Sequence, residues 1–197
     1  MSQRLKQVLE RIDRLNAEDP NKELVEGTPR PRELVYSERL TAWVLRLAPE
    51  ASETLRIAAR GQHLCRWTIP RQQYEMTRRG YLKWRETLKT FHAQRVGELM
   101  RETGYSEPEI TRVQRLMSKR ELSGDSETQT LEDALCLVFL ETQFADLRKK
   151  EPEAKMIEIL QKTWKKMSNR AHQEAQQLPL GPEERALIER ALHGASR

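Results

Sequence analysis

Apolar residues recur every three or four positions along most of the chain, a spacing typical of amphipathic helices. The first such stretch is residues 2–17, with Leu5, Val8, Leu9, Ile12 and Leu15 on one face. The same pattern predicts helices over about 33–47, 52–67, 80–103, 106–120, 127–148 and 152–176, and a short last helix near Pro182. Segment 18–32, with three prolines and a glycine, is expected to be a loop. No segment has a convincing strand pattern, so the sequence predicts an all-α fold: a single-domain helical bundle over 1–197.

Two of these helices have a recognisable start. Ser106 is followed three residues later by Glu109, and Ser126 is followed by Gln129. Both pairs have the spacing of a capping box. In that motif, the side chain of each residue accepts a hydrogen bond from the backbone N–H of the other. We therefore expect helices to begin at Ser106 and at Ser126.

Composition and targeting signals favour a cytoplasmic protein without a membrane partner. Hydrophobic residues make up 37% of the chain and charged residues 33%. No run approaches the roughly 18 apolar residues of a membrane span, and the N-terminus lacks the apolar segment of a signal peptide. Cys65 and Cys136 both lie in apolar helical contexts, so we expect reduced, buried thiols rather than a disulfide.

The net charge of +5 favours an anionic partner, such as a nucleotide, a phosphate or RNA. The alternative is that Lys and Arg side chains simply coat the helices. The chain has no block of five or six consecutive basic residues, and its 6% of aromatic residues provides few platforms for base stacking. The charge alone therefore leaves both interpretations open.

The segment "AARGQHLCRWTIPR", residues 58–71, places polar side chains directly after an apolar turn. On a continuous helix, Ala59, His63 and Arg66 would share one face. Arginine binds phosphate through two parallel hydrogen bonds, and Trp67 can stack on a base. This segment is therefore a candidate wall of a polar pocket, although a single His on an apolar face is usually a core residue.

Two other helices carry candidate polar residues on apolar faces. His92 lies on the apolar stripe of the predicted helix 80–103. Glu132 and Asp133 directly precede "ALCLVFL", residues 134–140, which predicts a buried helix because every face is apolar. A buried carboxylate needs a partner. Each of these carboxylates is therefore either part of a structural ion pair or a functional residue, which binds a ligand or transfers protons.

Several segments resemble, in order and spacing, the HD-domain superfamily of metal-dependent phosphohydrolases, which have an all-α fold. They are "YSERLTAWVL", "AARGQHL", "HAQRVGELMRETGY", "VQRLMSKREL" and "SETQTLEDA". The resemblance covers about residues 33–140 and implies an HD-like core there. Residues 1–32 would then add an N-terminal helix and loop, and residues 141–197 would add C-terminal helices.

Only His92 and Asp133 match the metal-binding pattern of that superfamily. Tyr36 stands in place of the first His, Gln62 and His63 replace the His-Asp pair, and Lys119 replaces a later His. The resemblance leaves two alternatives. Mn, Fe, Zn or Mg would bind His63, His92 and Asp133, with Glu132 nearby. Otherwise the pocket holds no metal, and Lys119 and the arginines supply the positive charge.

Other phrases of the sequence resemble an uncharacterised family, domain of unknown function 4202, over almost the whole chain. They are "AEDPN", "ELVYSERLTAW", "AARGQHLCRW", "IPR", "GYLKWR", "QTLEDALCLVFLE" and "KTWKKMS". A tRNA synthetase is not indicated. The Lys-Met-Ser of "KKMSNR", residues 165–170, lies in a predicted helix, and neither a HIGH-like motif nor a Rossmann pattern of strands accompanies it.

Three functions are therefore expected as alternatives. The first is binding, with or without hydrolysis, of a phosphorylated small molecule or nucleotide. Its catalytic residues would be His63, His92, Glu132 and Asp133, and its phosphate-binding residues Tyr36, Gln62, Arg66, Trp67, Arg71, Arg85 and Lys119. The second is a non-catalytic basic module for RNA or a ribosome- or tRNA-related partner. The third is a helical scaffold. The oligomeric state is left open.

Overall fold

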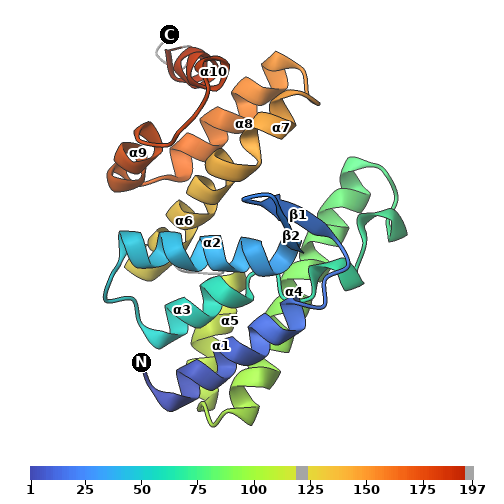
Figure 1. The fold of residues 1–197 in the computed structure, drawn as a ribbon, viewed down its shortest axis with the longest axis vertical. Coiled ribbons are helices and arrows are strands. Elements are labelled where there is room, and N and C mark those ends of the chain that lie inside the picture. Colours follow the sequence, from blue (N-terminus) through green and yellow to red (C-terminus); the bar gives the residue numbers. More distant parts are fainter. Residues whose placement is uncertain (119–123, 194–197) are drawn as a thin grey trace. The chain divides into compact units, whose positions relative to one another are not determined.

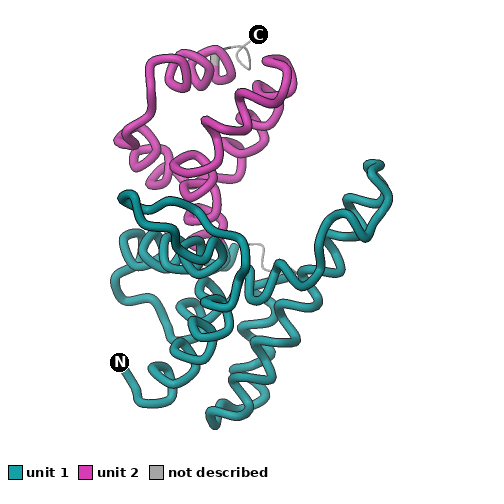
Figure 2. Tube along the Cα trace, turned by 45° about the vertical axis from the view of Figure 1, so that its right-hand side comes forward, with its two compact units in different colours: residues 1–128 teal, residues 129–197 magenta. Residues whose placement is uncertain are grey.

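The computed structural model describes residues 1–118 and 124–193 (Figure 1). The chain divides into two compact units, residues 1–128 and 129–197, and each is described by itself (Figure 2). The described residues are helical apart from one two-stranded hairpin and the connecting loops, which confirms the all-α prediction. The single-domain organisation and the HD-like core over 33–140 stay predictions.

The first unit contains most of the elements. They are α1 (Gln3–Asn16), β1 (Lys22–Val25), β2 (Thr28–Pro31), α2 (Arg32–Leu47), α3 (Glu53–Gly61), the 3-10 helices η1 (Arg66–Thr68) and η2 (Arg71–Gln73), α4 (Arg78–Glu102) and α5 (Glu107–Ser118). The division between the units falls inside α6 (Ser126–Thr142). The second unit continues with α7 (Phe144–Arg148), α8 (Glu153–Lys166), α9 (Asn169–Gln176) and α10 (Pro182–His193).

The short helix α3 is the centre of the first unit, because α1, α2, α4 and α5 all pack against it. Its Ile57, Ala58 and Ala59 have no exposed surface. Gly61 ends the helix at its closest approach to α4, where an added Cβ would come within 2.4 Å of Val96 Cγ2. A glycine is therefore required for α3 and α4 to lie this close together, and the residues that follow it are held against α4.

The expected loop over 18–32 contains an antiparallel hairpin, so the prediction that the chain has no strand was wrong. Glu26 and Gly27, between β1 and β2, both have positive φ angles, of 50° and 80°. Two such residues form the tight turn whose twist suits an antiparallel pair. Val25 pairs with Thr28 and Lys22 with Pro31. The prolines of β2 concealed this strand, because proline is tolerated only at a sheet edge or a strand end.

The predicted helix over 52–67 ends early, at Gly61. Cys65 adopts a left-handed conformation, with φ of 54°, and its backbone N–H donates to Asn16 Oδ1 at 3.1 Å. This conformation is uncommon for a residue with a side chain. A contact with a residue 49 positions earlier thus accompanies the end of the helical path. His63 lies in a turn and Arg66 in the 3-10 helix η1, so the two are not on one helix face. The two long predicted helices over 127–148 and 152–176 are likewise broken, at Gln143 and after Lys166.

The helix starts and the cysteines were predicted with mixed success. The capping box at Ser106 is confirmed in part, because its backbone N–H donates to Glu109 Oε2 at 2.8 Å. At α6 the cap is Asp125, whose Oδ1 accepts from the backbone N–H of Thr128 at 2.8 Å, so the predicted box between Ser126 and Gln129 was wrong. Both cysteines are free and buried, as predicted. None of the described helices is long and apolar enough to cross a membrane.

Candidate functional site

Five polar or aromatic side chains from α2, η1, α4 and the turn after α3 meet in the first unit. They are Glu33, Tyr36, His63, Arg66 and His92, here called the His63 cluster. The imidazole of His63 is at its centre, 6.0 Å from the ring of His92 and stacked at 3.9 Å on the ring of Tyr36. The structure therefore places His63 and His92 in the same cluster.

Glu33 is the member that sequence analysis missed. It precedes Tyr36 by three residues, so extending the apolar stripe of α2 by one turn would have shown that it faces the interior. Pro31, at the start of α2, offers no side-chain cap. The fully buried Asp19 takes that role from the preceding segment, and its Oδ2 accepts from the backbone N–H of Glu33 at 3.0 Å. This contact fixes the start of α2, and with it the position of the Glu33 carboxyl group.

The hydrogen bonds of His63 define its tautomer. Arg66 Nη1 lies 3.3 Å from His63 Nε2, and a guanidinium group can only donate, so Nε2 accepts. Nδ1 therefore carries the ring proton and donates to Glu33 Oε2 at 3.0 Å. Both ring nitrogens are used and the imidazole is neutral. The result is a Glu33–His63–Arg66 chain of hydrogen bonds held flat against Tyr36.

His92 differs from His63 in that only one of its two ring nitrogens has a hydrogen-bond partner among the described residues. Its Nδ1 lies 2.8 Å from the backbone oxygen of Leu64, which can only accept, so Nδ1 carries the proton. Nε2 then holds a lone pair that is buried and has no hydrogen-bond partner among the described residues. The whole residue is only 4% exposed. A buried, unsatisfied acceptor is costly, and it is free to accept a hydrogen bond from a ligand or water.

Arg66 is positioned by aromatic contacts as well as by hydrogen bonds. Its guanidinium carbon lies 4.8 Å from the centre of the Trp84 ring, and Trp84 Nε1 in turn donates to the backbone oxygen of Ile69 at 2.8 Å. The Arg66 side chain is one quarter exposed. Arg85 is close enough to lower the pKa of both His63 and Arg66. Arg85 thus adds a second positive charge close to the cluster.

The Glu33 carboxyl group has a strongly altered proton affinity. Burial raises its pKa to about 7, and the negative charge of Asp19 adds to the rise. The positive charge of Arg66 opposes the rise without cancelling it. Glu33 is therefore divided between its neutral and ionised forms near neutral pH, which is the range in which a carboxyl group can both take up and release a proton.

The two histidines are held neutral. Burial lowers the pKa of His92 to about 3, and the neighbouring His63 contributes to the decrease. Burial also lowers the pKa of His63 well below its usual range, with further contributions from Arg66 and Arg85. Within the His63 cluster, the group that titrates near neutral pH is consequently Glu33.

The remaining predicted phosphate-binding residues have different environments. Gln62 follows α3, and its Oε1 is buried without a hydrogen-bond partner in the described structure. Trp67 is half-buried in η1. Arg71 donates to the backbone oxygens of the loop that follows it, so its hydrogen bonds are structural. Lys119 lies outside the described residues.

Glu132 and Asp133 belong to the second unit, where both have partners. Glu132 Oε1 lies 3.4 Å from Lys166 Nζ. Asp133 Oδ1 accepts from Gln129 Nε2 and from the backbone N–H of Ser168, both at 2.8 Å, and its Oδ2 accepts from the Ser168 hydroxyl. Ser168 caps α9. The carboxylate of Asp133 therefore ties the start of α9 to α6, and its predicted catalytic role stays a prediction.

Replacing Asp133 with Ala is expected to lower the free energy of unfolding by about 2–3 kcal/mol, because charge-assisted hydrogen bonds are lost and their donors are left inside the protein. Asp133→Asn keeps one acceptor oxygen and should cost less. Urea denaturation followed by circular dichroism measures both. Unchanged stability in Asp133→Ala would contradict this structural role.

The residues of the first unit do not fit the metal site that the HD resemblance implies. Both ring nitrogens of His63 already have partners, and His92 offers a single free nitrogen. Across the described parts of both units, no group of three or more His, Cys, Asp or Glu residues could hold a metal ion. We therefore derive no chemistry through a metal.

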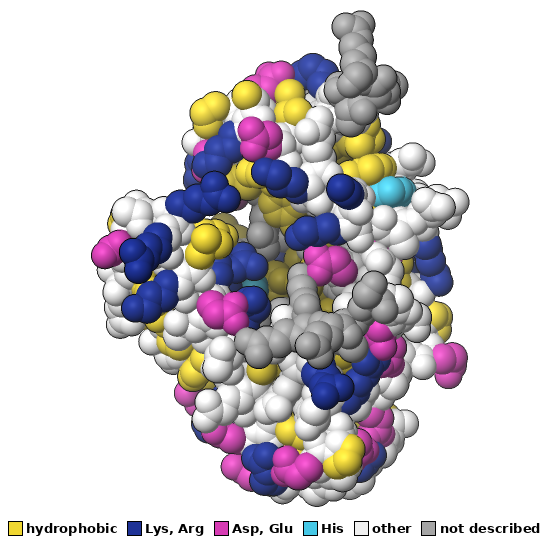
Figure 3. Space-filling view, turned by 180° about the vertical axis from the view of Figure 1, so that it is seen from behind, with side chains coloured by type: hydrophobic (Ala, Val, Ile, Leu, Met, Phe, Trp, Pro, Cys, Tyr) yellow, Lys and Arg dark blue, Asp and Glu magenta, His cyan; other side chains and the backbone are white. Residues whose placement is uncertain are grey.

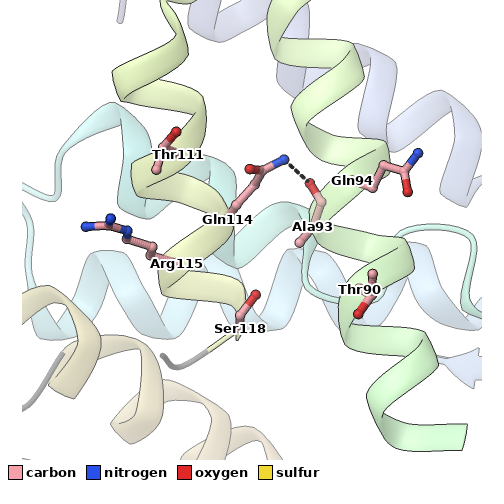
Figure 4. A pocket seen from close by; sticks show the side chains of 7 residues that line it. All are labelled: Thr90, Ala93, Gln94, Thr111, Gln114, Arg115 and Ser118. Atoms are coloured by element: carbon pink, nitrogen blue, oxygen red, sulfur yellow. Dashed lines mark hydrogen bonds between the residues drawn. The ribbon is translucent and has the colours of Figure 1, made fainter. Parts of the chain in front are cut away.

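A separate groove of about 490 Å³ lies between α4 and α5 (Figure 4). Its lining is mostly neutral: Thr90, Ala93, Gln94, Thr111, Gln114, Arg115 and Ser118. Gln114 donates across it to the backbone oxygen of Ala93 at 3.2 Å. It contains none of the predicted site residues and no group with an altered pKa, so the His63 cluster is the stronger candidate site.

Comparison with known families supports one of the two resemblances in the sequence. The model of a family described as domain of unknown function DUF4202 matches residues 6–188. No curated protein matches the chain, and no solved structure does. The match spans both units and includes every residue of the His63 cluster. The chain belongs to the DUF4202 family.

Proposed function

We propose that this protein binds a phosphorylated small molecule or nucleotide at the His63 cluster, beside the partly exposed Arg66. The observation that carries the proposal is the buried Glu33–His63–Arg66 chain, with the unpartnered Nε2 of His92 beside it. This arrangement lowers the stability of the folded state, so a purely structural role does not explain it. It keeps a carboxyl group, two imidazoles and a guanidinium away from bulk water, with one acceptor unsatisfied.

The arginines supply the charge for an anion. Arg66 is half of an incomplete ion pair, because its Nε lies 3.8 Å from Glu33 Oε1 and Glu33 is only partly ionised near neutral pH. Arg85 is exposed and its positive charge acts on the same cluster. Guanidinium groups bind phosphate through paired hydrogen bonds. A phosphate group between Arg66 and Arg85 would relieve their mutual repulsion.

Glu33 would couple the binding of this anion to a proton. The anion adds negative charge next to the carboxyl group, which favours its neutral form. Binding should then raise the pKa of Glu33 above 7, and the protein should take up a proton when the ligand binds. The same exchangeable proton makes Glu33 the group best suited to act as an acid or base if the bound ester is hydrolysed.

The test uses a panel of inorganic phosphate, pyrophosphate, AMP, ATP and glucose 6-phosphate, first by thermal shift and then by calorimetry. A ligand that binds the native state raises the melting temperature with concentration. Arg66→Gln should weaken binding about 10- to 100-fold, the loss expected for one charge-assisted contact. The matched control is Arg14→Gln, because Arg14 is exposed on α1 and makes no ion pair with a described residue. No Arg66-dependent binding across the panel would overturn the proposal.

A further inference from the structure

A second surface of the first unit combines exposed cations with exposed hydrophobic side chains. It comprises Met76, Arg78, Arg79, Tyr81, Leu82 and Lys83, at the start of α4 and just before it, and is here called the α4 surface. These residues are exposed, with Met76 79% and Leu82 57% accessible. The start of α4 and the segment before it project from the other helices of this unit (Figure 2). Figure 3 shows Lys and Arg side chains beside hydrophobic ones on this projecting part.

The cations of the α4 surface have no carboxylate partners among the residues that the structure describes. Arg78, Arg79 and Lys83 make no ion pair with any described residue. Elsewhere in the chain, arginines are commonly matched: Arg4, Arg11, Arg30, Arg39, Arg60, Arg101, Arg112 and Arg148 all contact Asp or Glu. Cations in the first turn of a helix are also electrostatically unfavourable. Ion pairs and the helix dipole therefore do not explain the positive charges at these positions.

The loop that presents this surface is firmly built. Arg71 Nη1 donates to the backbone oxygen of Tyr74 at 2.9 Å, and its Nη2 donates to that of Glu75 at 2.6 Å. Gly80 allows the loop to close on α4, because an added Cβ would lie 2.1 Å from the backbone oxygen of Glu75. Thr77 caps the helix through the backbone N–H of Gly80. Met76 is held outward between these anchored residues.

The chemistry of the surface fits a single-stranded nucleic acid better than a membrane. Tyr81 is 42% exposed, and the guanidinium carbons of Arg71 and Arg85 lie 6.0 Å and 5.9 Å from its ring centre. Aromatic rings and guanidinium planes are the platforms on which unpaired bases stack. The unpaired cations are mostly arginine, which contacts phosphate through two bonds at once.

We infer that the α4 surface binds single-stranded RNA, with Arg78, Arg79 and Lys83 on the phosphates and Tyr81 stacked on a base. Arg85 contacts Tyr81 and also belongs to the proposed phosphate site, whereas Arg78, Arg79 and Lys83 do not. Variants at these three residues and at Arg66 therefore test the two proposals separately.

The test is fluorescence anisotropy with a labelled oligouridylate of about 20 nucleotides, longer than one expected binding site. The triple variant R78Q/R79Q/K83Q should bind at least about tenfold more weakly. The slope of log affinity against log salt should become shallower by about 2, as expected when three contacts to single-stranded phosphates are lost. Tyr81→Ala should weaken binding at least about fivefold, whereas Tyr81→Phe, which keeps the ring, should bind like the parent.

The matched control is R14Q/K150Q/K165Q, which removes the same charge from exposed positions elsewhere. An equal loss of affinity in this control would overturn the inference, because attraction by net charge would then be sufficient. A parent protein that does not bind the oligouridylate would also overturn it. So would binding to vesicles of 30% phosphatidylserine in phosphatidylcholine, lost in the triple variant, together with no RNA binding.

Discussion

Replacing Glu33 with Gln is expected to stabilise the protein at pH 8 by up to about 3 kcal/mol. Folding raises the pKa of Glu33 from 4.5 to about 7, and each pKa unit corresponds to about 1.4 kcal/mol. The folded state holds the proton more tightly than the unfolded state. The contribution of Glu33 to stability is therefore complete below pH 4.5 and is lost as the pH rises through 7. Gln resembles the protonated form and does not ionise.

The measurement is urea unfolding of the parent and of Glu33→Gln at pH 5, 6, 7 and 8. The two free energies of unfolding should be similar at pH 5 and should separate as the pH rises. The matched control is Glu102→Gln, because Glu102 forms an exposed ion pair with Arg11, and such pairs contribute less than about 1 kcal/mol. A variant at position 33 that is less stable than the parent at pH 8 would contradict the altered proton affinity of Glu33.

His92 should make a contribution to stability that is lost on the acid side of neutrality. Its pKa falls from 6.5 to about 3 on folding, so the unfolded state binds a proton first as the pH decreases. The contribution of His92 is present above pH 6.5 and is lost as the pH falls towards 3. Between pH 7 and pH 5 the parent should lose about 2 kcal/mol through this residue.

His92→Asn tests this expectation, because an amide can still donate to the backbone oxygen of Leu64 but does not titrate. The variant will be less stable at every pH, since it loses packing volume. The informative quantity is the change in the free energy of unfolding between pH 7 and pH 5. That change should be about 2 kcal/mol smaller in the variant than in the parent. Equal changes would show that His92 is not held neutral by the fold.

The helical fold could be predicted because local patterns determine it. The spacing of Leu5, Val8 and Ile12 is sufficient to define α1, and the pair Ser106 and Glu109 marks the start of α5. The hairpin was missed because β2 contains two prolines in four residues. The early end of α3 was missed for a different reason. It depends on Asn16, which is far away in the sequence and adjacent to Cys65 only in the folded protein.

Part of the candidate site could also be predicted from local sequence patterns. His63, Arg66 and His92 stand out as polar residues beside apolar ones, and the structure brings them together. Glu33 has an ordinary sequence context and becomes unusual only when α2 packs against the turn after α3 and the buried Asp19 lies beside it. Arg71 shows the reverse case. Its position suggested a phosphate ligand, whereas its donors bind the loop that supports the α4 surface.

Stability and the proposed function make opposite demands on the His63 cluster. Glu33 in its ionised form and the unsatisfied Nε2 of His92 both lower the stability of the folded state. Such costs are typical of binding and catalytic sites, where substitutions that stabilise the fold remove the activity. Glu33→Gln is expected to be more stable than the parent and to take up no proton at this position when the ligand binds. The destabilisation by Glu33 and the proton uptake would then both arise from its raised pKa.

The most direct measurement is the number of protons taken up when the best phosphorylated probe of the panel binds at pH 7. Titration calorimetry in two buffers of different ionisation enthalpy gives this number. Glu33 is about half ionised at pH 7 because its pKa is about 7, and binding of an anion beside it should complete its protonation. The parent should therefore take up about half a proton more than Glu33→Gln for the same probe. Equal proton uptake by the two proteins would contradict binding at the His63 cluster.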